Sequence, residues 1–491
     1  MPFENSPVAA SLRMPDQLDG GGILVGWSME EERARQPIGF GFGDPAKTPR
    51  TGYIDPILLE GEGHLITIAP TGAGKGIGAI VPALLRFPGP VIVIDPKGEN
   101  AAITARRRRE MGQRVVILDP MGTVTQDGDR FDPLDLINPE SPTGVDDAVL
   151  LATALLPESN GANAAFWVSR ARQLLTGLIL HVKTDLPAEA NALAAVRRLV
   201  NAAAGNPGML ANAMRESRHP EVRQIAENLA ISANETLGGI LSFAQEGIDF
   251  IRGPLVQRAV EKSTFSLDDV TRGAPLAIYI VLPPSMLESH GRLLRLWISV
   301  LIAAILRRRR RPDLSTLFIL DEAAQLGALS QLRQALTLLR GYGLQTWSFW
   351  QDATQLHQLY PSDWQTMVNN CRVLQAFGAN NRVAAQSMSD LVGFDGADNV
   401  LDLGPDEMLL QIAGDEAIVA KRPDYRNDPA FAGMFDANPL YDATLDPLPP
   451  PRPPLRFYLR PHRTSEERTE TDDSVDSDLA RRLIEMGKGR K

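Results

Sequence analysis

A short glycine-rich segment that carries one lysine could bind a chain of phosphates. It reads Ala-Pro-Thr-Gly-Ala-Gly-Lys-Gly over residues 69–76 and follows the apolar stretch Leu65–Ile68. Glycines allow successive backbone N–H groups to curl around phosphate oxygens, and the lysine adds positive charge at the terminal phosphates. The helix expected next would offer its free N–H groups to the same anion. We therefore predict a nucleotide-binding loop that uses Thr71, Gly72, Ala73, Gly74, Lys75 and Gly76.

Two positions of this loop depart from the strict phosphate-loop pattern. Ala69 replaces the first glycine, which is harmless if its φ is negative, and Gly76 replaces the hydroxyl residue that normally binds Mg²⁺. The magnesium ion must then be held by other ligands. An ordinary glycine-rich turn is the alternative interpretation, and the expected order of strand, loop and helix makes it less favourable.

A pair of acidic residues after a second apolar stretch could supply metal binding and base catalysis. Asp321 and Glu322 directly follow Thr316–Leu320. We predict that Asp321 lies on the metal side and that Glu322 is the general base that polarises the attacking water. The structural alternative is that Asp321 caps the next helix. Gln351 directly follows the predicted strand Gln345–Trp350. It is predicted to contact the γ-phosphate and the water, or otherwise to be a surface amide.

The composition is that of a soluble globular protein of several domains. Of its 491 residues 44% are hydrophobic and 22% are charged, which excludes general disorder and fibrous repeats. Fifty basic and sixty acidic residues give a formal net charge of -10, so any contact with DNA must be local. The single cysteine, Cys371, cannot form an internal disulfide, and the six histidines lack metal-ligand spacing.

The elements that position these residues follow from the hydrophobic pattern, which predicts an α/β fold. Short continuous apolar runs are typical of strands buried on both faces of a parallel sheet, whereas residues 143–262 show helical spacing only. We expect a mostly parallel sheet flanked by helices, formed by residues 61–142 and 263–423, with an all-α domain inserted at 143–262. The predicted strands are 65–68, 91–94, 115–118, 276–282, 316–320, 345–350 and 373–377.

The two ends of the chain are expected to be less regular. Residues 1–60 are rich in glycine, proline and charge, which indicates an irregular lead-in. Residues Met408–Ala420 are predicted to form a β-hairpin around Gly414 and Asp415. Residues 424–491 are rich in proline and charge and are predicted to be an extended or disordered tail, which could dock a partner.

An ordered set of motifs resembles the type IV coupling proteins. These are the TraG-like ATPases of bacterial conjugation and type IV secretion, relatives of FtsK-type DNA pumps. The resemblance extends from about Gly63 to Ala420 and includes FWVSRARQLLTGLI within the helical region. The motifs are APTGAGKG at 69–76, VIVIDPKGEN at 91–100, GQRVVILDP at 112–120, FILDEAAQLG at 318–327, and LLRGYG at 338–343 followed by Gln351.

The resemblance implies a RecA-like nucleotide-binding domain and a homo-hexameric ring that hydrolyses ATP with Mg²⁺. Such rings deliver a relaxase–DNA complex or protein cargo to the components of a type IV secretion channel. By position, Lys75 corresponds to the phosphate-loop lysine, Asp321 and Glu322 to the Walker B pair, and Gln351 to the downstream glutamine. Arg340 matches an arginine that reaches the nucleotide of a neighbouring subunit; the alternative is an arginine placed at a helix end by the dipole.

The DPKGEN segment also matches the family pattern. Asp95 would end a strand next to the phosphate-loop strand, where it could lie close to Mg²⁺ or its waters. We therefore expect Asp95 and Asp321 to be the metal-side carboxylates, with Asp95 partly replacing the hydroxyl missing at Gly76. Glycine at that position also occurs in the family, so Gly76 does not indicate an inactive enzyme.

The sequence differs from typical coupling proteins because no transmembrane helix is evident near its start. The best candidate elsewhere, Leu293–Leu306, contains Arg295 and is shorter than the roughly 20 residues that span a bilayer, so we expect a buried helix. We expect a cytoplasmic protein that docks through partners, with peripheral association at the inner membrane as the alternative. A truncated protein is less expected, because the chain starts at Met1.

Two basic runs could bind single-stranded DNA without sequence preference. They are Arg106–Arg109 and Arg307–Arg311, and each follows a predicted helix, so the alternative is a structural role at a helix C-terminus. The structural role is favoured for the second run. The leading function is an ATP-driven coupling protein; the alternatives are a soluble FtsK/HerA-like DNA translocase outside secretion and a nucleotide-gated adaptor that does not turn over.

Overall fold

A twelve-stranded sheet organises the described part of the computed structural model. Its strand order is β3-β4-β2-β13-β12-β11-β5-β10-β9-β6-β8-β7, and the seven strands from β11 to β7 are parallel. These seven are β11 (Cys371–Ala376), β5 (His64–Ile68), β10 (Leu344–Trp350), β9 (Thr316–Leu320), β6 (Val91–Ile94), β8 (Leu276–Ile280) and β7 (Arg114–Leu118). The structure describes residues 9–12, 14–18, 21–28, 40–42, 55–156, 162–205, 207–230, 234–394, 396–441, 444, 447–450 and 455–458.

The parallel sheet is buried on both faces, as the continuous apolar runs predict. Along β6, Ile92 and Ile94 belong to one hydrophobic core, whereas Val91 and Val93 belong to the core on the opposite face. The mixed α/β architecture with a mostly parallel centre is therefore confirmed. The helices packed around the sheet are α1 (Val81–Arg86), α2 (Glu99–Glu110), α10 (Leu267–Arg272), α11 (Pro284–Leu306), α12 (Ser330–Leu338), α13 (Ala353–Leu359), α14 (Trp364–Asn369), α15 (Arg382–Val392) and α16 (Ala397–Leu401).

The N-terminal region contributes strands to the same sheet, which differs from the irregular lead-in expected for residues 1–60. Ile23–Ser28 forms β2, which pairs with β4 (Asp55–Leu59) and with β13 (Ile418–Lys421). The side chain of Trp27 is completely buried. The glycines around β2 favour an irregular segment, so the strand was not predicted from the sequence. Burial of its apolar residues stabilises it as part of the sheet. The remaining strands are β3 (Phe40–Phe42), β12 (Glu407–Ile412), and the separate antiparallel pair β1 (Ala9–Leu12) and β14 (Leu455–Tyr458). β12 and β13 form the predicted hairpin.

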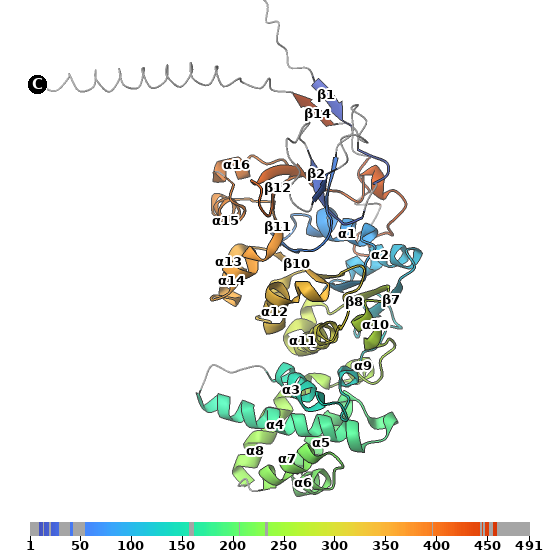
Figure 1. Cartoon of the computed structure of the whole chain (residues 1–491), viewed down its shortest axis with the longest axis vertical. Coiled ribbons are helices and arrows are strands. Elements are labelled where there is room, and N and C mark those ends of the chain that lie inside the picture. Colours follow the sequence, from blue (N-terminus) through green and yellow to red (C-terminus); the bar gives the residue numbers. More distant parts are fainter. Residues whose placement is uncertain are drawn as a thin grey trace, which may run out of the picture.

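Helices fill the region between β7 and β8, and no strand occurs among its described residues from 143 to 262. Figure 1 shows most of them gathered at one end of the molecule, beyond α11 and far from β2. Their apolar faces join the core on one side of the sheet. They are α3 (Gly144–Leu155), α4 (Ala162–Asp185), α5 (Leu193–Gly205), α6 (Pro207–Arg215), α7 (Pro220–Ala230), α8 (Asn234–Ile248) and α9 (Pro254–Ala259).

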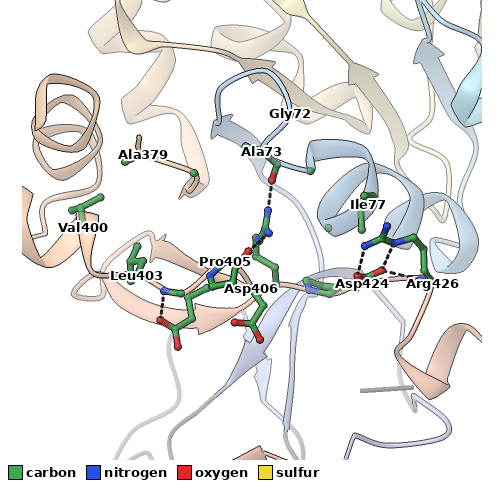
Figure 2. A pocket seen from close by; sticks show the side chains of 17 residues that line it. Gly72, Ala73, Ile77, Ala379, Val400, Leu403, Pro405, Asp406, Asp424 and Arg426 are labelled. Atoms are coloured by element: carbon green, nitrogen blue, oxygen red, sulfur yellow. Dashed lines mark hydrogen bonds and ion pairs between the residues drawn. The ribbon is translucent and has the colours of Figure 1, made fainter. Parts of the chain in front are cut away.

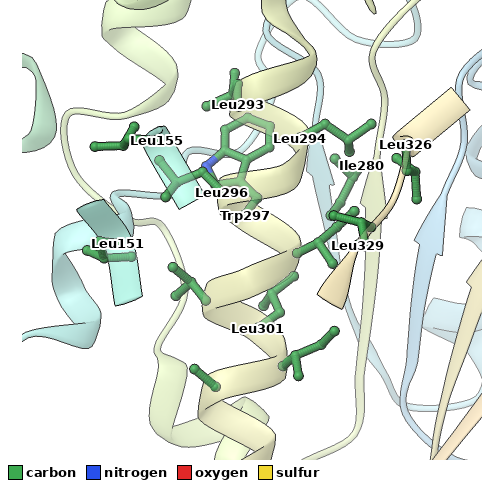
Figure 3. Packing of buried hydrophobic residues seen from close by; sticks show 14 of the residues in the cluster. Leu151, Leu155, Ile280, Leu293, Leu294, Leu296, Trp297, Leu301, Leu326 and Leu329 are labelled. Carbon is green, nitrogen blue, oxygen red and sulfur yellow. The ribbon is translucent and has the colours of Figure 1, made fainter. Parts of the chain in front are cut away.

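Helix α11 joins the helical region to the sheet. It is the one helix of the described residues that is long and apolar enough to cross a membrane, yet 67% of its most apolar window is buried inside the fold. Figure 3 shows Leu151 and Leu155 of α3 on one side of α11 and Ile280 of β8 on the other. Trp297 of α11 donates a hydrogen bond of 3.0 Å to the carbonyl oxygen of Phe131. The expected buried helix is therefore present.

The chain after Asp424 differs from the predicted tail over residues 424–441, whose buried aromatic residues pack against β2, α1 and α2. Tyr425 and Phe431 are 6% and 0% exposed and join a small core with Trp27. The Trp27 Nε1–H group donates to Asp428 Oδ2 at 3.1 Å, which links strand β2 near the N-terminus to the segment after Asp424. Aromatic residues thus anchor this segment despite its polar composition. Of the rest of the predicted tail, residues 459–491 lie outside the described residues.

Each basic run contributes one buried arginine to the fold. Arg108 is 0% exposed and Arg308 is 7% exposed. Their guanidinium groups donate hydrogen bonds to backbone carbonyl groups that end helices or turns, which favours the structural interpretation for both residues. The acceptors are the carbonyl oxygens of Leu84, Phe87 and Gly89 for Arg108, and those of Val270, Thr271, Tyr342 and Gly343 with Thr316 Oγ1 for Arg308.

Candidate nucleotide site

Four neighbouring parallel strands bring the predicted site residues to one edge of the sheet. The register pairs Ile68 of β5 with Trp350 of β10, and Leu320 of β9 lies beside both Ser348 of β10 and Ile94 of β6. Because parallel strands share one carboxyl edge, the residues that follow these strands must lie close together. The phosphate loop, Gln351, Asp321 and Asp95 therefore follow neighbouring strands. The expectation that the strand before Asp95 adjoins the phosphate-loop strand was wrong, because β10 and β9 lie between β5 and β6.

The phosphate loop has the backbone geometry of an anion cradle. Gly72 and Gly74 have φ values of 81° and 87°, which side chains disfavour, whereas Ala69 keeps a negative φ as required. The loop passes directly into a π-helical turn at Gly76–Ile80 and then into α1. Such turns are rare and occur frequently at functional sites. The N–H groups at this helix start are thus available to bind phosphate oxygens.

Lys75 is buried and directed along the loop toward the acidic residues. It is 9% exposed, and its Nζ donates to the carbonyl oxygen of Ala69 at 3.1 Å. The same ammonium group lies 3.6 Å from Glu322 Oε1. A phosphate bound in the loop would meet this ammonium group, which supplies positive charge next to Glu322.

Glu322 is held in an unusual backbone conformation. Its φ of 62° and ψ of 52° are left-handed, and it is the one non-glycine residue with positive φ in the described part of the chain. Its Oε2 accepts a hydrogen bond of 2.6 Å from Gln351 Nε2. Residues strained in this way cluster at functional sites. Helix capping by Asp321 is not observed, because Glu322 is the N-cap of the next short helix, Ala323–Leu326, and makes no capping hydrogen bond.

Asp95 and Asp321 form a second acidic cluster, linked by Asn100. Asp95 is 1% exposed and accepts hydrogen bonds from Asn100 Nδ2 at 3.2 Å and from the N–H group of Ala101 at 2.8 Å. Burial raises the pKa of Asp95 to about 7, and the neighbouring charge of Asp321 contributes to that rise. Burial, with the charge of Glu322, raises the pKa of Asp321 to about 6. A cation in this space would favour the ionised form of both carboxylates.

These carboxylates fit a magnesium ion held mainly by a nucleotide. No group of three or more His, Cys, Asp or Glu side chains suited to a metal occurs among the residues that the structure describes. Mg²⁺ in phosphate-transfer sites usually needs only one or two carboxylates, together with substrate phosphates and waters. The hard oxygen ligands of Asp95 and Asp321 meet that requirement.

A cavity of about 480 Å³ opens over these residues. It is lined by Thr71, Gly72, Gly74, Lys75 and Gly76 of the loop and by Asp95, Asp321 and Glu322. The packed segment after Asp424 forms its outer wall through Tyr425, Phe435 and Asn438. Asn438 Nδ2 donates to Glu99 Oε2 at 3.1 Å. The role of Asn100 and the wall formed by the segment after Asp424 were not predicted from the sequence. The aromatic residues at 425, 431 and 435 indicate in the sequence that this segment could pack against the fold.

Two residues predicted to belong to the site, Ala73 and Arg340, are not among the described residues that line the acidic cavity. Ala73 lines a cavity on the opposite side of the loop (Figure 2) rather than the acidic one. Arg340 lies in the short 3-10 helix Leu339–Tyr342, next to β10, and its side chain lies outside the described part of the structure. The role of Arg340 toward a neighbouring subunit therefore stays a prediction.

A family profile described as "Type IV secretory system Conjugative DNA transfer" matches residues 35–397, most of the chain. The chain belongs to this family. The resemblance found in the sequence is thereby confirmed.

Curated relatives and solved structures agree with this assignment. The conjugal transfer protein TraG of Agrobacterium fabrum is 30% identical over 353 residues, covering 69% of this chain and 52% of TraG. The protein VirD4 of Rhizobium rhizogenes is 30% identical over 338 residues, covering 65% of this chain and 46% of VirD4. The chain thus spans about half the length of these relatives. The conjugative coupling protein TrwBdeltaN70 shares the fold, with a TM-score of 0.58 and 19% identity over 74% of this chain and 88% of that chain.

Replacing Glu322 tests its backbone strain. Glu322→Gly and Glu322→Ala both remove the contacts of the carboxylate with Lys75 and Gln351, but only glycine relieves the left-handed conformation. We expect the glycine variant to have a free energy of unfolding about 0.5–1 kcal/mol higher than the alanine variant. Chemical denaturation measures the difference. An alanine variant that is equally stable or more stable would show that the backbone is not strained there.

The raised pKa of Asp95 predicts a pH dependence of stability. The folded state binds a proton at Asp95 up to about pH 7, whereas an unfolded aspartate releases it near pH 4. This contribution to the free energy of unfolding is therefore present below about pH 4 and is lost as the pH rises to about 7. We expect Asp95→Asn to lose less stability than the wild type between pH 4.5 and 7.5 in urea denaturation. The control is Asp313→Asn at an exposed site; equal slopes for Asp95→Asn and wild type would contradict the assignment.

Proposed function

We propose that this protein is a Mg²⁺-dependent ATPase that couples DNA–protein or protein substrates to a type IV secretion machine. The observation that carries the proposal is the convergence of Lys75, Asp321 and Glu322 around the phosphate loop in one cavity, with Gln351 hydrogen-bonded to Glu322. A cradle for phosphates and a base beside it are the two parts that hydrolysis of a phosphoanhydride requires.

Each residue has a distinct role in this proposal. The loop N–H groups and Lys75 bind the β- and γ-phosphate oxygens, and they stabilise the negative charge that develops during transfer. Glu322 accepts the proton of the attacking water, while the Gln351 amide, 2.6 Å from that carboxylate, orients the water. Asp321 and Asp95 would hold Mg²⁺ directly or through its waters, and the ion would neutralise charge on the phosphates.

The Lys75–Glu322 contact indicates how phosphate binding would prepare the base. The two groups lie 3.6 Å apart, so a γ-phosphate at Lys75 would compete with Glu322 for the ammonium group. Glu322 would then keep its hydrogen bond to Gln351 and be free to accept a proton. Nucleotide binding and activation of the base are thereby linked through one side chain.

The comparisons support the biological role. The relatives include conjugal transfer proteins TraG and type IV secretion coupling proteins VirD4. TrwB, which shares the fold, has been solved with a non-hydrolysable ATP analogue and with ADP and Mg²⁺. By analogy, we propose a homo-hexameric ring in which Arg340 reaches the nucleotide of the adjacent subunit. Its partners would be secretion-channel components and a relaxase–DNA complex or protein cargo, with single-stranded DNA as a direct ligand.

Two substitutions separate binding from hydrolysis. We expect Lys75→Ala to weaken nucleotide binding, because it removes the charge inside the cradle. Glu322→Gln should bind ATP normally but hydrolyse it about 10²–10⁴-fold more slowly, because it lacks the general base. Nucleotide titration and phosphate release, with and without single-stranded DNA, measure both.

The matched control neutralises an exposed carboxylate on α11, Glu288→Gln, which should hydrolyse ATP like the wild type. An assembled wild type that binds ATP but never hydrolyses it would favour the adaptor. Hydrolysis stimulated by DNA, without binding to secretion components, would favour a free DNA translocase. Equal hydrolysis by wild type and Glu322→Gln would refute the assigned base.

A further inference from the structure

A second lysine lies in the acidic cavity, beside the predicted metal-side carboxylates. Lys97 belongs to the segment Asp-Pro-Lys-Gly-Glu-Asn at residues 95–100, which follows β6. It lines the same cavity as Lys75, Asp321 and Glu322. An ammonium group at this position could meet the terminal phosphate of a nucleotide held by the loop.

A tight turn fixes the backbone of Lys97 at the carboxyl edge of the sheet. The N–H group of Gly98 donates to the carbonyl oxygen of Asp95 at 3.1 Å, which closes a turn with Pro96 and Lys97 at its centre. Gly98 has a φ of 74°, and a Cβ there would collide with Val124, so this position favours glycine. The turn thus holds the start of the Lys97 side chain at one place, close to Asp95.

The neighbouring strand brings Asp321 close to this turn. Ile94 of β6 pairs with Leu320 of β9, so the residues that follow the two strands lie side by side. Burial is the main cause of the raised pKa of Asp321, and the positive charge of Lys97 acts against that rise. The ammonium group is therefore near enough to the acidic residues to interact with them.

Lys97 is the one cationic side chain of this cavity that makes no hydrogen bond in the described part of the chain. Lys75 donates to a backbone carbonyl group of the loop, and Arg426 binds Asp424 through two nitrogen atoms. Lys97 is 62% exposed, and its Nζ lies 3.8 Å from Glu99 Oε1, beyond hydrogen-bond distance. Ion pairs that are this exposed contribute little stability, so the ammonium group can move to another anion at little cost.

Glu99 is anchored independently of the lysine. Its Oε2 accepts a hydrogen bond of 3.1 Å from Asn438 Nδ2, whereas its Oε1 faces Lys97. The carboxylate therefore keeps a partner when the lysine moves away, which lowers the cost of breaking the ion pair.

The charges that line the cavity favour a second cation on the terminal phosphate. Among the described residues, three cationic side chains line the cavity against five acidic ones, which are Asp95, Glu99, Asp321, Glu322 and Asp436. A phosphate brings further negative charge among these carboxylates, while the ammonium group of Lys75 already lies 3.6 Å from Glu322. A second ammonium group would offset repulsion that Lys75 alone would otherwise have to balance.

We propose that Lys97 is a further catalytic residue, whose ammonium group leaves Glu99 and contacts the terminal phosphate of the bound nucleoside triphosphate. This inference rests on the proposed nucleotide hydrolysis and deepens it, because it names a second cation for the transferred group. Negative charge on the phosphoryl oxygens is stabilised during transfer by such contacts. A nucleoside diphosphate lacks the terminal phosphate, so Lys97 should not contribute to its binding.

Calorimetric titration of the full chain with Mg²⁺ and either ADP or a non-hydrolysable ATP analogue tests the proposal, together with phosphate release from ATP. Lys97→Met keeps a long unbranched side chain and removes its charge, whereas Lys97→Arg restores a cation. The exposure of Lys97 means that both variants should fold like the wild type. Lys262→Met is the matched control, because Lys262 is exposed and does not line the cavity in the described structure.

We expect Lys97→Met to bind the ATP analogue about tenfold more weakly than the wild type does, with its affinity for ADP unchanged. Its kcat for ATP should fall about 10²-fold, because one charged donor to the transferred group is lost. Lys97→Arg should recover most of both quantities, and Lys262→Met should behave like the wild type. A purely structural role of Lys97 would not change the ratio of the two affinities.

Three results would overturn the proposal. They are an unchanged ratio of the two affinities in Lys97→Met, an equal loss of affinity for ADP and the ATP analogue, and tighter binding of the ATP analogue by that variant. If wild type bound neither nucleotide, the proposed hydrolysis itself would fail. Normal binding and hydrolysis by both wild type and Lys97→Met would refute only the role of Lys97.

Discussion

The structure depends on the shared carboxyl edge of four parallel strands, β5, β10, β9 and β6. That geometry brings the phosphate loop, Gln351, Asp321 and Asp95 together although they are separated by up to 282 residues in the chain. Glu322 then connects the parts, because its carboxylate contacts both Lys75 and Gln351. Its left-handed backbone directs the carboxylate into the cavity, at a cost that the surrounding sheet must offset.

The two ends of the chain support this edge from outside. Trp27 of β2 holds Asp428, and Arg106 of α2 binds Asp436 at 2.7 Å, so the segment after Asp424 is fixed beside the acidic residues. Arg422, just before that segment, donates to the carbonyl oxygen of Ala73 on the opposite side of the loop. The loop is therefore supported by elements far from it in sequence, and both cavities have walls made by the C-terminal region.

Local patterns allowed the central sheet and the acidic site to be predicted. The seven parallel strands are rich in apolar residues, and the loop glycines and the pair at 321–322 carry their chemistry in their types and spacing. Long-range pairing explains what was missed. Ile23–Ser28 forms a strand because β4 and β13 pair with it. The segment 424–441 is packed because its aromatic residues share a small core with Trp27. These partners are distant in the sequence, so local patterns could not predict the contacts.

The central claim is that one polyphosphate lies between Lys75 and the acidic residues at 321–322. A structure of the full chain with a non-hydrolysable ATP analogue and Mg²⁺ tests it most directly. The account predicts the γ-phosphate within hydrogen-bond distance of Lys75 Nζ and the metal beside Asp321, with the Lys75–Glu322 contact opened. A nucleotide bound elsewhere, or terminal phosphates on the β11 side of the loop, would contradict it.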